Sequence, residues 1–106
     1  MKVLLDESVP RILGFELPGH FVRTVQAMGW AGLSNGHLLA AMAEISFEVL
    51  ITCDQNIEYQ QNSALPVGLI ILIAPDNRVP TILGLALAIR EQLGAIRVGQ
   101  IVKVRV

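Results

Sequence analysis

Short apolar runs alternate with longer segments of helical character, and this alternation constrains the fold of the chain more than any other feature. Three runs are continuously apolar (2–6, 48–52 and 67–73), and two alternate apolar with polar residues (21–25 and 100–106). Continuous apolar strands are typical of a parallel sheet that is covered on both faces. The pattern therefore predicts an α/β fold, a three-layer sandwich with a mostly parallel central sheet and the strand 100–106 at its edge.

Capping signals place helices between these strands. Four segments are expected to be helical, because each follows a residue that favours an N-cap or carries a proline in its first turn. These segments are the one between Ser8 and Pro18, the one from Ser34 or Asn35 to about residue 46, a short one from Asp54 to Tyr59, and 79–93 with Pro80 near its start.

The composition excludes several classes of protein. A length of 106 residues predicts a single domain over 1–106, and 53% hydrophobic with 16% charged residues excludes disorder. The most apolar stretch, 64–75, is too short for a membrane span, and no signal peptide is expected, so we predict a cytoplasmic protein without membrane contact. The single cysteine, Cys53, excludes an internal disulfide and a multi-cysteine zinc site. A net charge of −1 lacks the overall basic character of many nucleic-acid-binding proteins.

Acidic residues stand at the ends of two of the apolar strands. Asp6 and Glu7 end the first strand, and Asp54 follows the third. Ligands of open parallel sheets bind beyond the carboxyl ends of the strands, where converging carboxylates repel each other unless a cation lies between them. Oxygen ligands suit Mg²⁺ or Mn²⁺ better than zinc. The sequence therefore predicts a Mg²⁺ or Mn²⁺ site at Asp6 and Asp54. Glu7 can join this site only if a turn begins at Asp6. The alternative is that these acids cap helices or lie in solvated turns.

Polar neighbours of these acids can complete a hydrated coordination shell. They are Ser8, Asn35, Gln55, Asn56 and Asn77. His20, His37 and Cys53 are expected to be structural or surface residues, because no second ligand lies at a metal-binding spacing from either histidine and because Cys53 ends a buried strand. Trp30, which lies between two glycines, is either a loop anchor or a lid over the site.

Several segments together resemble the PIN-like domain family, short bacterial proteins that are similar to PIN-domain nucleases. They are 4–11, 17–20, 29–36 and 51–56 with 60–62, and the most specific motifs are Leu-Leu-Asp-Glu at 4–7 and Thr-x-Asp-x-Asn at 52–56. The resemblance implies a compact parallel-sheet sandwich, a Mg²⁺- or Mn²⁺-binding acidic cluster and cleavage of RNA phosphodiester bonds. It also implies the role of toxin in a toxin–antitoxin pair, with a protein antitoxin as partner.

The resemblance assigns roles to individual residues. Asp6 matches the acid of the first strand and Asp54 the acid after the third strand, so both are expected to be catalytic and to bind the metal. Relatives often carry an aspartate at the start of the middle helix, where this chain has Asn35, which adds no negative charge. The missing acid can be supplied by Glu7 or by Glu58, and the sequence does not choose between them.

Two other functions compete with a metal-dependent ribonuclease. The first is a catalytically weak or inactive binding protein that keeps the fold and engages a protein partner. The second is a receiver-like phosphoacceptor domain, which also places acids after its first and third strands. A receiver needs a hydroxyl residue after the fourth strand and a lysine after the fifth, whereas this chain has Ala74 and Pro75 there and Lys103 inside its last strand.

The segment 79–93 carries the last expectation, which concerns association. Its first eleven residues contain Thr81 as the only side chain able to form a hydrogen bond, and apolar residues extend well around the helix. A helix that covers one face of a sheet needs only an apolar stripe of about 100°. We therefore expect a homodimer, with an antitoxin as the rival partner and burial of both faces within the domain as the alternative.

Overall fold

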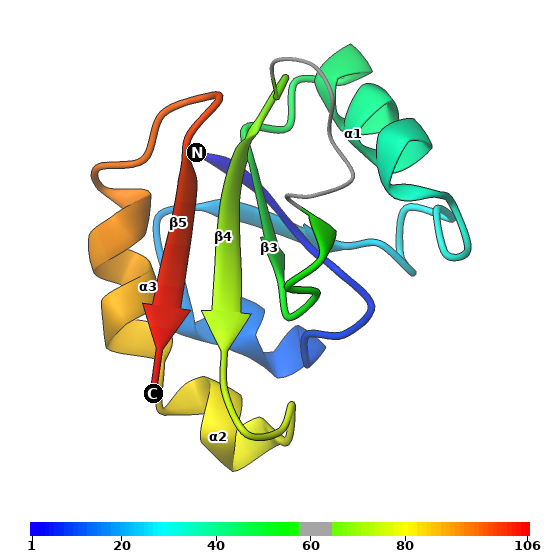
Figure 1. Ribbon diagram of the computed structural model, residues 1–106. Helices are drawn as coiled ribbons and strands as arrows, with labels where there is room; N and C mark the ends of the chain where they lie inside the picture. Colours follow the sequence, from blue (N-terminus) through cyan, green and yellow to red (C-terminus); the bar gives the residue numbers. More distant parts are fainter. Residues whose placement is uncertain (58–64) are drawn as a thin grey trace.

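A five-stranded, all-parallel sheet forms the centre of the computed structural model, which describes residues 1–57 and 65–106 (Figure 1). The strand order is β2-β1-β3-β4-β5. The strands are β1 (Lys2–Leu5), β2 (Phe21–Thr24), β3 (Val49–Thr52), β4 (Gly68–Ile73) and β5 (Ile101–Arg105). The predicted α/β class with a parallel sheet is confirmed, as is the edge position of the last strand.

The continuously apolar strands are buried on both faces, as their sequences predict. In the β1–β3 register Val3 pairs with Val49 and Leu4 with Leu50. Val3 and Val49 belong to one buried apolar cluster, and Leu4 and Leu50 belong to a second one. Because successive side chains of a strand point to opposite faces, the two clusters lie on the two sides of the sheet.

Helices cover both of these clusters. The first cluster includes residues of a 3₁₀ helix, η1 (Arg11–Glu16), and of the α-helices α2 (Val79–Leu83) and α3 (Ala86–Leu93). The second includes residues of α1 (Asn35–Glu44). Trp30 packs against this second cluster, and its ring meets that of Phe47 edge-on at 5.9 Å between centroids. The structure therefore favours the interpretation of Trp30 as a loop anchor.

Two predicted helices differ from the structure. The segment after Ser8 forms only η1, which begins after Pro10 without a side-chain cap, because the Ser8 hydroxyl bonds elsewhere. The predicted helix 79–93 is divided at Gly84, and α2 and α3 run in different directions (Figure 1). Glycine is a poor residue for a helix interior, and the break lets Ile82 of α2 and Ile89 of α3 enter the same core cluster.

The division of this segment changes which apolar side chains face outward. Ile82 and Ile89 are fully buried in the first cluster, whereas Leu87 is 62% exposed. Much of the apolar surface that suggested association is thus covered within the domain itself. None of the helices in the two described ranges has the length and apolar character needed to cross a membrane.

Candidate functional site

Asp6 is held at the carboxyl edge of the sheet by the backbone of its neighbour strand. It directly follows β1, and its N–H donates to the carbonyl oxygen of Ile51 in β3 at 3.0 Å. The Val9 N–H in turn donates to the Asp6 carbonyl oxygen at 3.0 Å, so a turn begins at Asp6. The turn that Glu7 would need is thus present, and a half-buried Asp6 carboxylate lies beside the end of β3.

Two hydroxyl groups fix the Asp6 carboxylate. The Oδ2 atom of Asp6 accepts hydrogen bonds from Ser8 Oγ at 2.9 Å and from Thr52 Oγ1 at 2.8 Å. Bonds to a charged acceptor are stronger than those between neutral groups. They hold one oxygen of Asp6, while its Oδ1 accepts no hydrogen bond from the residues that the structure describes.

Thr52 connects the two predicted metal ligands. It is the last residue of β3 and, within 1–57 and 65–106, the only polar residue that is fully buried. Its Oγ1 donates to Asp6 and accepts from the Asp54 N–H at 3.0 Å, so the buried hydroxyl is satisfied in both directions. Thr52 begins the motif Thr-x-Asp-x-Asn at 52–56, but no role at the site was expected of it. The available signal was a hydroxyl at the end of a continuous apolar strand, two residues before the acid.

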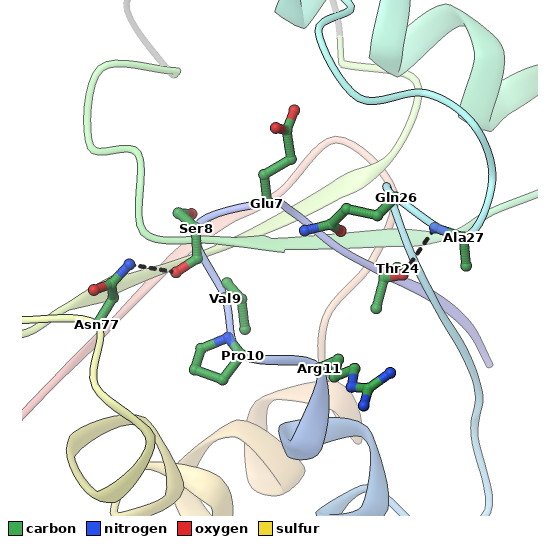
Figure 2. A pocket seen from close by; sticks show the side chains of 9 residues that line it. All are labelled: Glu7, Ser8, Val9, Pro10, Arg11, Thr24, Gln26, Ala27 and Asn77. Atoms are coloured by element: carbon green, nitrogen blue, oxygen red, sulfur yellow. Dashed lines mark hydrogen bonds between the residues drawn. The ribbon is translucent and has the colours of Figure 1, made fainter.

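Ser8 connects this carboxyl edge of the sheet with two further segments. Its Oγ accepts from the Cys53 N–H at 3.0 Å, and its carbonyl oxygen accepts from Asn77 Nδ2 at 3.1 Å (Figure 2). Burial raises the pKa of the Cys53 thiol above its ordinary value. The Ser8 hydrogen bond offsets part of this rise, and the negative charge of Asp6 adds to it. A thiol of this kind stays protonated near neutrality, and Cys53 packs against the first core cluster, as expected of a structural cysteine.

Asp54 meets the start of α1. Its Oδ1 accepts from the Asn56 N–H at 2.9 Å, and its Oδ2 lies 3.5 Å from the side-chain Nδ2 of Asn35, the first residue of α1. The structure thus brings Asp54 and Asn35 together from separate segments. Asn56 serves here through its backbone N–H. The rival third acid, Glu58, and the end of the short helix expected after Asp54 lie outside the described residues.

Glu7, the other candidate third acid, is bonded to a nearby loop. Its Oε1 accepts from the Gly32 N–H at 3.1 Å, and Figure 2 shows its carboxylate pointing away from Val9 and Pro10. In the described ranges no group of three or more His, Cys, Asp and Glu side chains lies close enough together to hold a metal ion. What the described residues do gather is the pair Asp6 and Asp54, with the amide of Asn35 beside it.

A pocket of about 590 Å³ opens next to this cluster, beyond the carboxyl ends of β1 and β2 (Figure 2). Ser8 is shared, because it bonds Asp6 and also lines the pocket. Most of the lining side chains are polar, and one is a cation: Glu7, Ser8, Arg11, Thr24, Gln26 and Asn77. A guanidinium, hydroxyls and amides at a sheet edge form a suitable environment for a phosphate-bearing ligand.

The remaining sequence candidates lie outside this network. The backbone N–H and the Nδ1 atom of His37 both face Ser34 Oγ, at 3.4 and 3.0 Å, at the start of α1. Ser34 is therefore the N-cap of α1, as one of the two predicted alternatives, and His37 has a structural role. His20 lines a different groove, and Gln55 is exposed.

The fold and this edge define the chain as an α/β protein with a parallel sheet and with two aspartates, Asp6 and Asp54, whose carboxylates are each hydrogen-bonded where two central strands end. Comparison with protein-family models, with curated proteins and with solved structures finds no match to the chain.

Proposed function

We propose that the chain is a Mg²⁺- or Mn²⁺-dependent ribonuclease of PIN-like type, with the cation held by Asp6 and Asp54. The observation that carries this proposal is a network of contacts at the edge where β1 and β3 end. The Thr52 hydroxyl joins the Asp6 carboxylate to the Asp54 backbone, and the Asp54 carboxylate faces Asn35 from a third segment. Carboxylate and amide oxygens are the ligands that these hard cations prefer. When bound, the cation supplies neutralisation of phosphate charge and activation of water.

The neighbouring residues prepare the carboxylates for this task. The hydroxyls of Ser8 and Thr52 orient Asp6 through its Oδ2 and leave its Oδ1 available to a cation. The Asn56 N–H orients Asp54 in the same way through Oδ1. Such outer hydrogen bonds fix the direction of metal-binding groups, so the site needs little reorganisation on binding.

The substrate and partner follow from the resemblance of the motifs at 4–7 and 52–56 to PIN-like proteins. It supports RNA as the substrate, a protein antitoxin as a partner and a role as the toxin of such a pair. The polar pocket beside Ser8, with Arg11 in its wall, supports a phosphate-bearing substrate on independent grounds. A homodimer through the exposed part of α3, around Leu87, belongs to the same proposal.

A catalytically weak or inactive binding protein is the second candidate, and two observations favour it. Asn35 adds no charge at the place where an aspartate is expected, and its amide nitrogen faces the Asp54 carboxylate. Glu7 is engaged by the Gly32 N–H. A receiver-like phosphoacceptor has less support, because Ala74 and Pro75 follow β4 and Lys103 lies within β5.

The test is Mn²⁺-dependent cleavage of an end-labelled RNA by the native chain and by Asp6→Asn, Asp54→Asn and Glu44→Gln. Glu44 is an exposed acid at the end of α1 and serves as the matched control. We expect both aspartate variants to lose cleavage and the Glu44 variant to retain it, with native circular dichroism in all four proteins. Cleavage that survives in EDTA, or in both aspartate variants, would refute the metal-dependent mechanism.

Asn35→Asp separates the two candidates. An added carboxylate strengthens cation binding, so a weak nuclease should gain both Mn²⁺ affinity in calorimetry and cleavage rate. A protein that gains affinity and still cleaves no RNA supports the binding-protein candidate.

A further inference from the structure

A second groove, of about 810 Å³, lies between η1 and the edge strand β2. It shares Arg11, Thr24 and Ala27 with the pocket beside Ser8, so the groove and the pocket adjoin each other. Arg11 and Thr24, which Figure 2 shows at one side of that pocket, form the boundary between them. A ligand lying in this groove can therefore extend towards Asp6.

The lining of the groove combines exposed aromatic rings with cations. Phe15 is 84% exposed and Phe21 is 47% exposed, which leaves aromatic surface open to solvent. Arg11, Arg23 and His20 also line the groove, whereas none of its lining residues is an aspartate or glutamate. Exposed apolar patches of this kind mark binding surfaces, and the absence of carboxylates favours an anionic ligand.

The two arginines differ in how they are held. The Arg23 guanidinium stacks over the Phe21 ring at 4.0 Å from its centroid and donates from Nη1 to the Val22 carbonyl oxygen at 3.0 Å. The Arg11 side chain makes no hydrogen bond or ion pair with the part of the chain that the structure describes. One guanidinium is thus fixed beside an aromatic ring, and the other is available to an incoming anion.

We propose that this groove binds unpaired nucleotides of a single-stranded RNA whose backbone continues to the Asp6–Asp54 edge. A base stacks on Phe15, and the neighbouring phosphates contact Arg11 and Arg23. Aromatic side chains with interspersed cations are the usual platform for single strands, because every base has a face that can stack. The inference rests on the proposed function and adds the substrate class and the residues that select it.

A second copy of the chain fits the groove less well. A two-fold interface places the same surface of both copies together, so the cations Arg11 and Arg23 of one copy would meet a surface of the other that carries the same cations and no carboxylate. Pairing along the edge of β2 is also obstructed. The Val22 carbonyl oxygen accepts from Arg23, and the Thr24 carbonyl oxygen accepts from the Met28 N–H at 3.1 Å, so both are already bonded. An added strand would have to displace these bonds.

Fluorescence anisotropy with a labelled, unstructured eight-nucleotide RNA tests the proposal in EDTA, where binding is measured without cleavage. We expect the native chain to bind and Phe15→Ala to bind roughly 5- to 140-fold more weakly, the range for loss of one stacked base. Arg11→Gln should flatten the dependence of log affinity on log salt by about 0.7, the value for one contact to a single-stranded phosphate. Val98→Ala, at an apolar residue that is 60% exposed and lines neither the groove nor the pocket, is the control and should bind as the native chain does.

Other outcomes separate this inference from the proposed function. Asp54→Asn should bind RNA normally in EDTA while losing cleavage in Mn²⁺. RNA bound through Phe15 but never cleaved would support the groove and overturn the nuclease. If Phe15→Ala binds RNA with native affinity, the proposal that RNA binds in the groove is refuted. It is also refuted if ultracentrifugation shows a dimer that Phe15→Ala dissociates while the affinity for RNA stays the same.

Discussion

Replacement of Thr52 by valine tests the hydroxyl that joins Asp6 to Asp54, because valine has nearly the same shape and carries a methyl group in place of the hydroxyl. The substitution removes the 2.8 Å bond to the Asp6 carboxylate, and a bond to a charged group contributes about 1.5–3 kcal/mol to stability. It also removes the acceptor of the Asp54 N–H, which costs about 1 kcal/mol. The added methyl group in a fully buried position recovers about 0.8 kcal/mol.

Because Asp6 is only half-buried, water can replace part of its lost bond, and we expect the lower end of this range. The free energy of unfolding should fall by about 2 kcal/mol, which lowers the melting temperature of a domain of this size by roughly 9 °C. Urea unfolding followed by circular dichroism at pH 7 measures the change. Thr52→Ser, which keeps the hydroxyl and loses a buried methyl group, should cost about 1 kcal/mol.

Thr24→Val is the matched control, because Thr24 Oγ1 also accepts a backbone N–H, that of Ala27 at 3.0 Å, and bonds no charged group. It should cost about 0.5–1 kcal/mol. A change of less than about 0.5 kcal/mol in Thr52→Val would refute the reasoning. The same conclusion follows if Thr52→Ser destabilises as much as Thr52→Val, since the hydroxyl would then not be the source of the effect.

Three further predictions concern packing, capping and protonation. Gly68→Ala should lower the free energy of unfolding by about 1–3 kcal/mol, because a Cβ there would lie 3.1 Å from a side-chain atom of Ile96. Unchanged unfolding in urea would contradict this prediction. Ser34→Ala removes the N-cap of α1 and should cost about 1 kcal/mol in the same assay, and a neutral effect would mean that the cap contributes nothing. The raised pKa of the Cys53 thiol should make its alkylation by iodoacetamide near pH 8 slower than that of free cysteine. Asp6→Asn removes a negative charge that raises this pKa, so it should speed the reaction and shift its pH profile to lower pH, and a slower reaction would refute the cause assigned to Asp6.

Much of the architecture could be read from local patterns. The continuous apolar runs identified β1, β3 and β4, since only a strand covered on both faces tolerates apolar residues at every position. The boundaries were less well determined: the last strand begins at Ile101 and not at residue 100, and the helix capped by Ser34 ends at Glu44 and not near residue 46. Ends of elements depend on where their last carbonyl and N–H groups find partners, which is decided outside the segment.

The amino-acid sequence by itself determined that Asp6 and Asp54 stand at strand ends, because their positions after apolar runs are a local property of the chain. Only the tertiary structure decided what surrounds them. Ser8 looks like an N-cap locally, yet its hydroxyl bonds Asp6 and the Cys53 N–H, which are brought to it by the pairing of β1 with β3. Thr52 gained its role in the same way, since a buried hydroxyl must bond whatever polar groups the fold places beside it. Hydrogen bonds between distant segments have no signature in either segment alone. For that reason the sequence could name the acids and Ser8, Asn35 and Asn56 as polar neighbours, while the bonds that join them and the role of Thr52 could not be predicted.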